Sequence, residues 1–386
     1  MVRGATRSCA VAALSTSSKV TVNDVLRRFV PEFRRTKSTS PWAKGVLDWL
    51  CACRTAALGG RMLSCACGWS RPVYNSCGNR HCPTCRAGAR AEWLAARRLS
   101  ILPVPHFQVV FTLPGALRTV ARANPRIVYP LLFRAAAQTL QQLAAERLGA
   151  QLGLLGVLHT WANDLVLHPH VHFLVTAGGL DVDRQRWVET GDTYLFPTRV
   201  MAALFRGKVL EALRKYAEAG SLWPPRSKDC GRTDGALRAA YRHRWVVHVE
   251  PPNGRRAETA AAYLARYVAG TALSNRRIVG MSKTHVTFQT RRGPMRLSGV
   301  EFVRRFASHI LPPRQHRVRY YGLYAPGNLH TRWVLARRLL DVPFPAEPPP
   351  RPKRSCPECG GVLTESSIPG LPRCRPARPP QARGPP

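Results

Sequence analysis

The chain of 386 residues carries 59 lysines and arginines against 21 aspartates and glutamates, which gives a formal net charge of +38 at pH 7. So large a positive charge predicts a polyanionic partner, most of all nucleic acid. The alternative explanation of the charge is an arginine-rich composition bias. No apolar run approaches the roughly 20 residues of a membrane span, and residues 1–19 are too weakly apolar for a secretory signal. We therefore expect a cytoplasmic protein without a membrane partner, in which the 12 cysteines are metal ligands rather than disulfides.

Hydrophobic periodicity predicts small helices at the start of the chain and an α/β pattern after them. The first helices span residues 20–35, with Asn23 as a candidate cap, and 42–50, and a basic amphipathic helix spans residues 87–100. Strands are expected at residues 106–113, 152–159, 171–176 and 245–250, a hairpin at 278–290, and helices at 126–148, 200–219 and 257–268. Beyond residue 340 the chain is rich in proline and arginine and should be mostly disordered.

Seven of the 12 cysteines lie between residues 51 and 85, which predicts a zinc module. The pair Cys82-Pro-Thr-Cys85 follows the pair Cys65-Ala-Cys67 after 14 intervening residues, near the spacing of a zinc ribbon. Ribbons usually begin with Cys-x-x-Cys, so Cys77 or Cys53 is an alternative to Cys65, and His81 is also within reach. Cys356 and Cys359, with Cys374, supply three ligands of a second candidate knuckle.

Three histidines stand at period two in the string His168-Pro169-His170-Val171-His172. An extended strand turns such residues to one face, and imidazoles held on a rigid strand make a metal site with open coordination positions. Because proline cannot donate to a β-ladder, we expect the strand to begin near His170, with His168 on its extended entry. We expect Gly178 and Gly179 to end the strand in a turn.

Tyr263 and Tyr267 are four residues apart on the helix expected at residues 257–268, so both hydroxyls project from one face. Taken alone, such a pair is more often a core contact of an amphipathic helix. A divalent-metal strand, two tyrosines on one helix face and a strongly basic chain together favour metal-assisted phosphoryl transfer to tyrosine.

With these motifs in place, the chain resembles the rolling-circle transposases of bacterial insertion sequences, the two-tyrosine HUH class typified by the insertion-sequence ninety-one family. The resemblance covers most of the chain. It is carried by CRTAALGG at residues 53–60, YNSCGNRHCPTC at 74–85, PVPHFQVVFTLP at 103–114, LHTWANDLVLHPHVHFLV at 158–175, AAYLARYV at 261–268, SNRRI at 274–278 and RVRYYGLYA at 317–325.

The resemblance implies an α+β fold in which a zinc-ribbon-like module precedes an HUH endonuclease domain, an antiparallel sheet with flanking helices. We expect a helical lead-in at residues 1–50, the zinc-binding module at 51–100, the catalytic domain at 101–340, and a tail at 341–386 with a candidate cysteine knuckle. Structural Zn²⁺ would bind among the first module's cysteines, namely Cys53, Cys65, Cys67, Cys77, Cys82 and Cys85.

The resemblance also implies roles for single residues. His170 and His172 would hold a catalytic Mg²⁺ or Mn²⁺, and the third ligand is open between His159, Asp164 and His168. Tyr263 and Tyr267 would be the nucleophiles that form 5′-phosphotyrosine links with single-stranded DNA at the element ends, without a nucleotide cofactor, near the bacterial nucleoid. Candidate DNA contacts are Arg266, Asn275, Arg276, Arg277, Arg317 and Arg319, and a solvated basic face is the alternative for each.

Three other functions compete with transposition. A binuclear hydrolase also uses His-x-His strands, but the chain lacks the eight-fold βα pattern of such barrels. A zinc-dependent DNA-binding protein derived from a transposase would not need the tyrosines and histidines that are present here. A replication initiator or relaxase would share the chemistry in another biological setting, and the cysteine module favours transposition over it.

Overall fold

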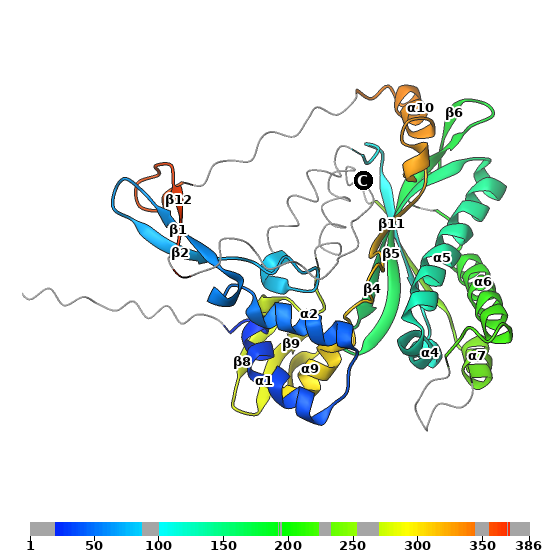
Figure 1. The fold of residues 1–386 in the computed structure, drawn as a ribbon. Coiled ribbons are helices and arrows are strands. Elements are labelled where there is room, and N and C mark those ends of the chain that lie inside the picture. Colours follow the sequence, from blue (N-terminus) through cyan, green and yellow to red (C-terminus); the bar gives the residue numbers. More distant parts are fainter. Residues whose placement is uncertain are drawn as a thin grey trace, which may run out of the picture.

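A computed structural model of the protein describes residues 20–86, 100–191, 193, 195–223, 233–252, 270–343, 355–368 and 370 (Figure 1). The tyrosine helix expected at residues 257–268 lies outside the described residues, as does nearly all of the basic helix expected at 87–100. Among the helices that are described, none is long and apolar enough to cross a membrane.

A central antiparallel sheet organises the larger part of the chain. Its strand order is β11-β4-β5-β3-β7, formed by β3 (His106–Thr112), β4 (Gln151–Trp161), β5 (Leu167–Asp181), β7 (Val246–Glu250) and β11 (Val318–Gly322), and β6 (Arg186–Glu189) pairs with the end of β5. The expected antiparallel sheet within an α+β fold is confirmed. Side chains alternate between the two faces of each strand, so the sequence determines what each face carries.

One face of this sheet packs against helices, and it carries most of the apolar core. The covering helices are α4 (Arg118–Ala123), α5 (Pro125–Leu148), α6 (Thr198–Glu218) and α7 (Thr233–Arg242), which lie together on one side of the strands in Figure 1. Phe111 and Phe173 point from the strands to Phe205 and Phe133 of α6 and α5, with ring centroids 4.9 Å and 6.3 Å apart. Gly149 ends α5 at a φ of +60°, the left-handed conformation that glycine adopts most easily.

Among the residues that the structure describes, apolar side chains cover the opposite face over only part of its length. Leu155, Val157 and Leu174 form a small core with Trp333 of α10 (Arg332–Leu339) and Leu323. The next residues on this face are His159, after Val157 on β4, and His172 and His170, before Leu174 on β5. The histidines therefore begin where the cover from α10 ends.

The N-terminal helices α1 (Val22–Thr36) and α2 (Pro41–Ala52) do not form a core by themselves. They share one with β8 (Ile278–Met281), β9 (His285–Thr290), β10 (Gly293–Ser298) and α9 (Gly299–Ala307), elements more than 200 residues later in the chain. The two regions lie side by side in Figure 1, at the left of the central sheet. The hairpin expected at residues 278–290 is confirmed, and β10 extends it to three strands.

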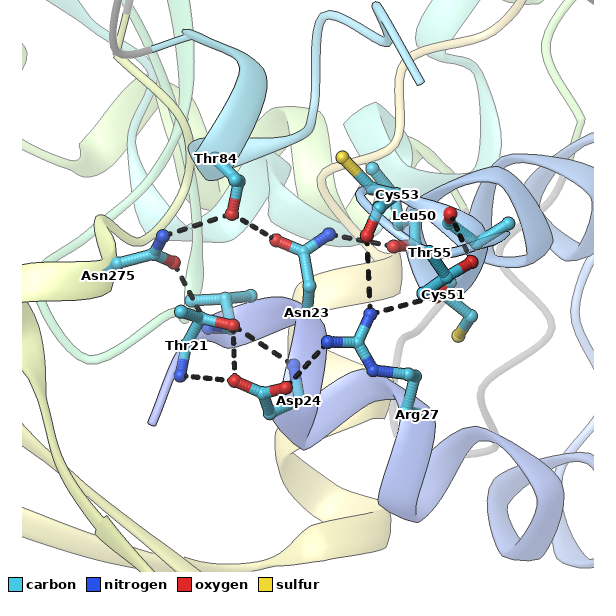
Figure 2. A network of polar contacts seen from close by, with 12 residues as sticks. Thr21, Asn23, Asp24, Arg27, Leu50, Cys51, Cys53, Thr55, Thr84 and Asn275 are labelled. Atoms are coloured by element: carbon cyan, nitrogen blue, oxygen red, sulfur yellow. Dashed lines mark hydrogen bonds and ion pairs between the residues drawn. The ribbon is translucent and has the colours of Figure 1, made fainter. Parts of the chain in front are cut away.

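The expected cap of the first helix is wrong by two residues. Thr21 caps α1, because its hydroxyl accepts the amide of Asp24, whose carboxylate accepts the amide of Thr21. Asn23 is instead buried at 2% exposure, and Figure 2 shows its amide between the Leu50 carbonyl and the Thr84 hydroxyl, at 2.7 Å and 2.6 Å. Asn23 thus joins α1 to α2 and to the cysteine module.

A small three-stranded sheet projects from this region. Its order is β12-β1-β2, with β1 (Gly60–Ser64), β2 (Ser70–Tyr74) and β12 (Thr364–Ser367), all antiparallel. Residues 355–368 of the expected tail thus fold back onto the N-terminal module.

Candidate functional site

Three histidines from two neighbouring strands meet on the face of the central sheet opposite α4–α7. His159 of β4 stands directly opposite His170 of β5, and His172 follows on the same face. One ring nitrogen from each lies within 4.8 Å of the others, and the ring centroids are 4.8–5.4 Å apart. This spacing lets three imidazoles converge on one ion while other coordination positions stay open.

The histidine strand is longer than its sequence suggests. β5 begins at Leu167, so His168 and Pro169 belong to the strand, contrary to the expected start near His170. Pro169 is tolerated because the β4–β5 register shifts there, between the pairs at His159 and Trp161. Gly178 and Gly179 do not end the strand either, since both pair with β6, and β5 runs to Asp181.

Of the three candidates for a third ligand, the structure groups His159 with His170 and His172. The His168 carbonyl accepts a hydrogen bond of 2.7 Å from Nδ1 of His170, which fixes the tautomer and leaves Nε2 of His170 with its lone pair for a metal. The Asp164 carboxylate accepts the backbone amide of Val166 at 3.1 Å, so it closes the β4–β5 turn.

Burial keeps the central imidazoles neutral. It lowers the pKa of His170 to about 4 and that of His172 to about 3, because the charged forms lose their hydration. Neutral imidazole is the form that binds a metal, so both side chains are ready as ligands at pH 7. Three imidazoles with open positions fit a divalent transition-metal ion, whereas Mg²⁺ prefers carboxylate, carbonyl and water oxygens.

A stack of aromatic and cationic side chains continues from the His159 ring. The Trp161 ring is stacked on the His159 ring with centroids 4.5 Å apart, and the guanidinium of Arg317 lies 4.9 Å from the Trp161 centroid. Burial lowers the pKa of Arg317 to about 9, so it remains a cation at pH 7. Arg317, expected to contact DNA, therefore packs against the site's tryptophan.

The histidines line a pocket of about 670 Å³ with a basic rim. Arg277 lines it and donates to the Gln289 carbonyl at 2.7 Å and to the Asn163 carbonyl, which ties the β8–β10 sheet to the β4–β5 turn. Arg291 and Arg292 line it from the turn between β9 and β10, and both are exposed. Sequence reasoning missed this pair, which directly follows the hairpin expected at residues 278–290, although two adjacent arginines there were a usable signal.

The other expected DNA contacts have different surroundings. Arg276 is exposed beside Arg277. Asn275 uses its amide internally, because Nδ2 donates to Thr84 and Oδ1 accepts the amide of Val22, each at 3.1 Å (Figure 2). Arg319 pairs in register with Gly156 and lies 5.3 Å from the Phe133 ring, on the helix-covered face.

The expected nucleophiles Tyr263 and Tyr267, and the expected DNA contact Arg266, lie outside the described residues. The segment that holds them begins three residues after the end of β7, a strand of the same sheet as the histidines.

Four cysteines form a tight group in the core beneath α1 and α2. Cys53, Cys77, Cys82 and Cys85 have sulfur atoms within 4.8 Å of one another, with contacts of 3.3 Å, 3.5 Å and 3.6 Å. A tetrahedral Cys₄ zinc site needs about 3.8 Å between sulfurs, so the group has the donor set and spacing of structural zinc. We call it the inner site.

The expected ribbon pairing differs from the observed one. Cys65 and Cys67 do not join Cys82 and Cys85; they lie beside Cys356 and Cys359, because the β1–β2 hairpin carries them away from the core. His81 is not part of the inner site either, since its Nε2 accepts the backbone amide of Leu311 at 3.3 Å.

Comparisons with known proteins match both the histidine region and the cysteine module. Residues 153–331, which include the histidines, match the family described as "Putative transposase", and residues 25–113 match the "Transposase zinc-binding domain". The chain is 37% identical to "Putative transposase y4qJ" of Sinorhizobium fredii (strain NBRC 101917 / NGR234) over 390 residues, which cover 92% of this chain and 97% of that relative.

A second relative is the "Transposase for insertion sequence element IS801" of Pseudomonas savastanoi pv. phaseolicola, 29% identical over 301 residues that cover 71% of this chain and 68% of the relative. No solved structure matches the chain. The chain therefore belongs to the insertion-sequence ninety-one family of transposases and carries that family's zinc-binding domain near its N-terminus.

Proposed function

We propose that this transposase cleaves and rejoins single-stranded DNA at the ends of its element by metal-assisted tyrosine transesterification, in a rolling-circle type of transposition. The observation that carries the proposal is the group of His159, His170 and His172, which line one pocket together with three arginines. Tyr263 and Tyr267 are the proposed nucleophiles.

The pocket suits a DNA phosphodiester in size and in charge. Its volume of about 670 Å³ is within the usual range for a small-molecule site and accommodates a nucleotide unit. Arg277, Arg291 and Arg292 would attract and orient the phosphate. A divalent ion held by the three imidazoles would polarise the non-bridging phosphate oxygens and neutralise the charge of the transition state.

In the proposed step one phosphorus–oxygen bond forms as another breaks. The tyrosine oxygen forms a bond to phosphorus, the bond from phosphorus to the 3′-oxygen breaks, and the proton lost by the tyrosine is balanced by the proton gained by the departing 3′-hydroxyl. One phosphate ester replaces another, so no nucleoside triphosphate is consumed. Attack by a 3′-hydroxyl on the phosphotyrosine reverses the step and joins strands, and a second tyrosine lets one site hold donor and target links in succession.

Covalent capture tests this function. The full-length protein is incubated with Mn²⁺ or Mg²⁺ and single-stranded oligonucleotides that span the DNA flanking its own gene, and denaturant-resistant adducts are separated on a gel. We expect adduct only with metal, none in the Tyr263→Phe/Tyr267→Phe double variant, and little in His170→Ala. Tyr241→Phe is the matched control, because Tyr241 is 62% exposed on α7 and does not line the pocket.

A folded, zinc-loaded protein that binds these oligonucleotides without forming an adduct would support the competing function, a DNA-binding protein derived from a transposase.

A further inference from the structure

Four of the cysteines outside the inner site form a second group. Cys65 and Cys67 lie in the turn between β1 and β2, and Cys356 and Cys359 lie in the turn that precedes β12. The Cys65–Cys359 and Cys67–Cys356 sulfur distances are 3.5 Å and 3.7 Å across 294 and 289 residues of chain. All four sulfurs are within 4.8 Å of one another, again near the about 3.8 Å of a tetrahedral zinc site.

Backbone hydrogen bonds shape both turns around these sulfurs. The Cys65 amide donates to the Trp69 carbonyl at 2.8 Å, and Gly68 follows with a φ of +89°. In the second turn the Cys356 amide donates to the Gly361 carbonyl at 2.7 Å, and the Gly361 amide donates to the Cys359 sulfur at 3.4 Å. The amide hydrogen bond to the Cys359 sulfur holds that side chain in position on its turn.

Among the described residues, little else holds the strands beside this group together. All four residues of β12 are exposed, and so are three of the five in β2. The polar links are the strand pairing itself, a hydrogen bond of 3.1 Å from Thr364 to the Ser64 carbonyl, and an exposed ion pair of 3.2 Å between Arg61 and Glu365. An exposed ion pair contributes little, so a sheet this small needs a metal in place of a core.

We propose that Cys65, Cys67, Cys356 and Cys359 bind a second structural zinc ion, the outer site, which fastens residues 355–368 to the N-terminal hairpin. The match to the zinc-binding domain ends at residue 113, so half of this site comes from a segment beyond that domain. The zinc-binding domain of this chain is completed only when its C-terminal segment returns.

The outer site is also the one that loses its metal first. Cys67 and Cys359 are exposed, whereas Cys53, Cys77 and Cys82 of the inner site are at most 2% exposed and belong to the core beneath α1. A thiol-directed mercurial reaches exposed sulfurs before buried ones. Removal of the outer zinc should therefore release residues 355–368 while the inner site and the central sheet stay intact.

Zinc content is the first measurement. We expect two zinc ions per full-length chain, and one in Cys356→Ser/Cys359→Ser and in Cys65→Ser/Cys67→Ser, two variants that remove the same site from opposite ends of the chain. Cys51→Ser is the matched control and should retain two, because Cys51 is a half-buried free cysteine outside both groups. Cys374→Ser should also retain two; a fall to one would overturn the proposed ligand set.

The order of release is the second measurement, and it needs no variant. Titration of the wild-type protein with p-hydroxymercuribenzoate should release zinc in two phases of about one ion each. After the first phase, hydrogen exchange should rise at residues 60–64 and 364–367 and stay unchanged in β3, β4 and β5. A single phase, one zinc ion in the wild type, or exchange that rises across the central sheet in the first phase would each refute the outer site as described.

Discussion

The joint between the N-terminal helices and α9 gives a sharp test of the packing, through Gly299. A Cβ atom added at Gly299 would lie 2.0 Å, 2.2 Å and 2.3 Å from three ring atoms of Phe29, which is only 1% exposed. Ordinary carbon contacts are about 3.5–4.0 Å, so the ring would have to move by about 1.5 Å within a closed core. We expect Gly299→Ala to cost about 3 kcal/mol from overpacking, offset by up to about 1 kcal/mol of helix propensity.

The net loss of about 2 kcal/mol should appear as a decrease in the opening free energy of the α1 amides, measured by native-state hydrogen exchange of the zinc-loaded protein. Gly45→Ala in α2 is the matched control, because nothing lies within 4 Å of its added Cβ, and it should stabilise by about 0.5–1 kcal/mol. Adding Phe29→Leu to Gly299→Ala should cost less than the sum of the two single changes. If Gly299→Ala is neutral, or if the pair is additive within about 0.5 kcal/mol, the described contact is not what sets this stability.

Three further predictions concern the site and its surroundings. His159→Ala or His172→Ala should weaken Mn²⁺ binding, measured by calorimetry, by more than the roughly 10–100-fold typical of a residue that does not contact the metal. His168→Ala should weaken Mn²⁺ binding by less than about 100-fold. Equal losses in all three variants would reject His159 and His172 as ligands and His168 as a non-ligand. Trp161→Leu should weaken Mn²⁺ binding about 10-fold without lowering the unfolding midpoint by more than a few degrees, and Trp161→Phe should restore it. Burial lowers the pKa of His106 to about 4, so between pH 6.5 and 4 the unfolded chain binds a proton that the folded chain does not. The free energy of unfolding should therefore decrease as the pH is lowered, by about 2 kcal/mol at pH 5 from this group. In urea unfolding at pH 7.5 and 5.0, His106→Gln should lose less stability between the two pH values than the wild type.

Local patterns in the sequence predicted the elements that carry the metal site. The period-two histidines place His170 and His172 on one face of a strand, and the apolar residues around them made the strand itself predictable. The bounds of the strand were less predictable, because proline is usually excluded from a paired strand. The β4–β5 register shifts opposite Pro169, and the strand therefore tolerates it. His159 was one candidate among three, since the register that sets it opposite His170 is a property of strand pairing.

The partners of the remaining residues depend on contacts between distant parts of the chain. Nothing in the spacing of Cys65 and Cys67 indicates ligands almost 300 residues away, so the nearer Cys82 and Cys85 looked like the natural pair. Charge alone likewise does not say which face of a strand an arginine occupies. Arg319 is separated from the histidine face by its alternation along β11, which only the fold determines.

The return of the C-terminal segment to β1 has a consequence for how the protein is made. At about 5–20 residues per second of synthesis, the ribosome needs about 15–60 s to add the 294 residues that separate Cys65 from Cys359. The inner-site cysteines emerge together early, whereas the β1–β2 hairpin waits with one edge and two thiols unpaired until residues 355–368 have been made. During that interval the nascent chain carries an open strand edge, which residues 364–367 later cover.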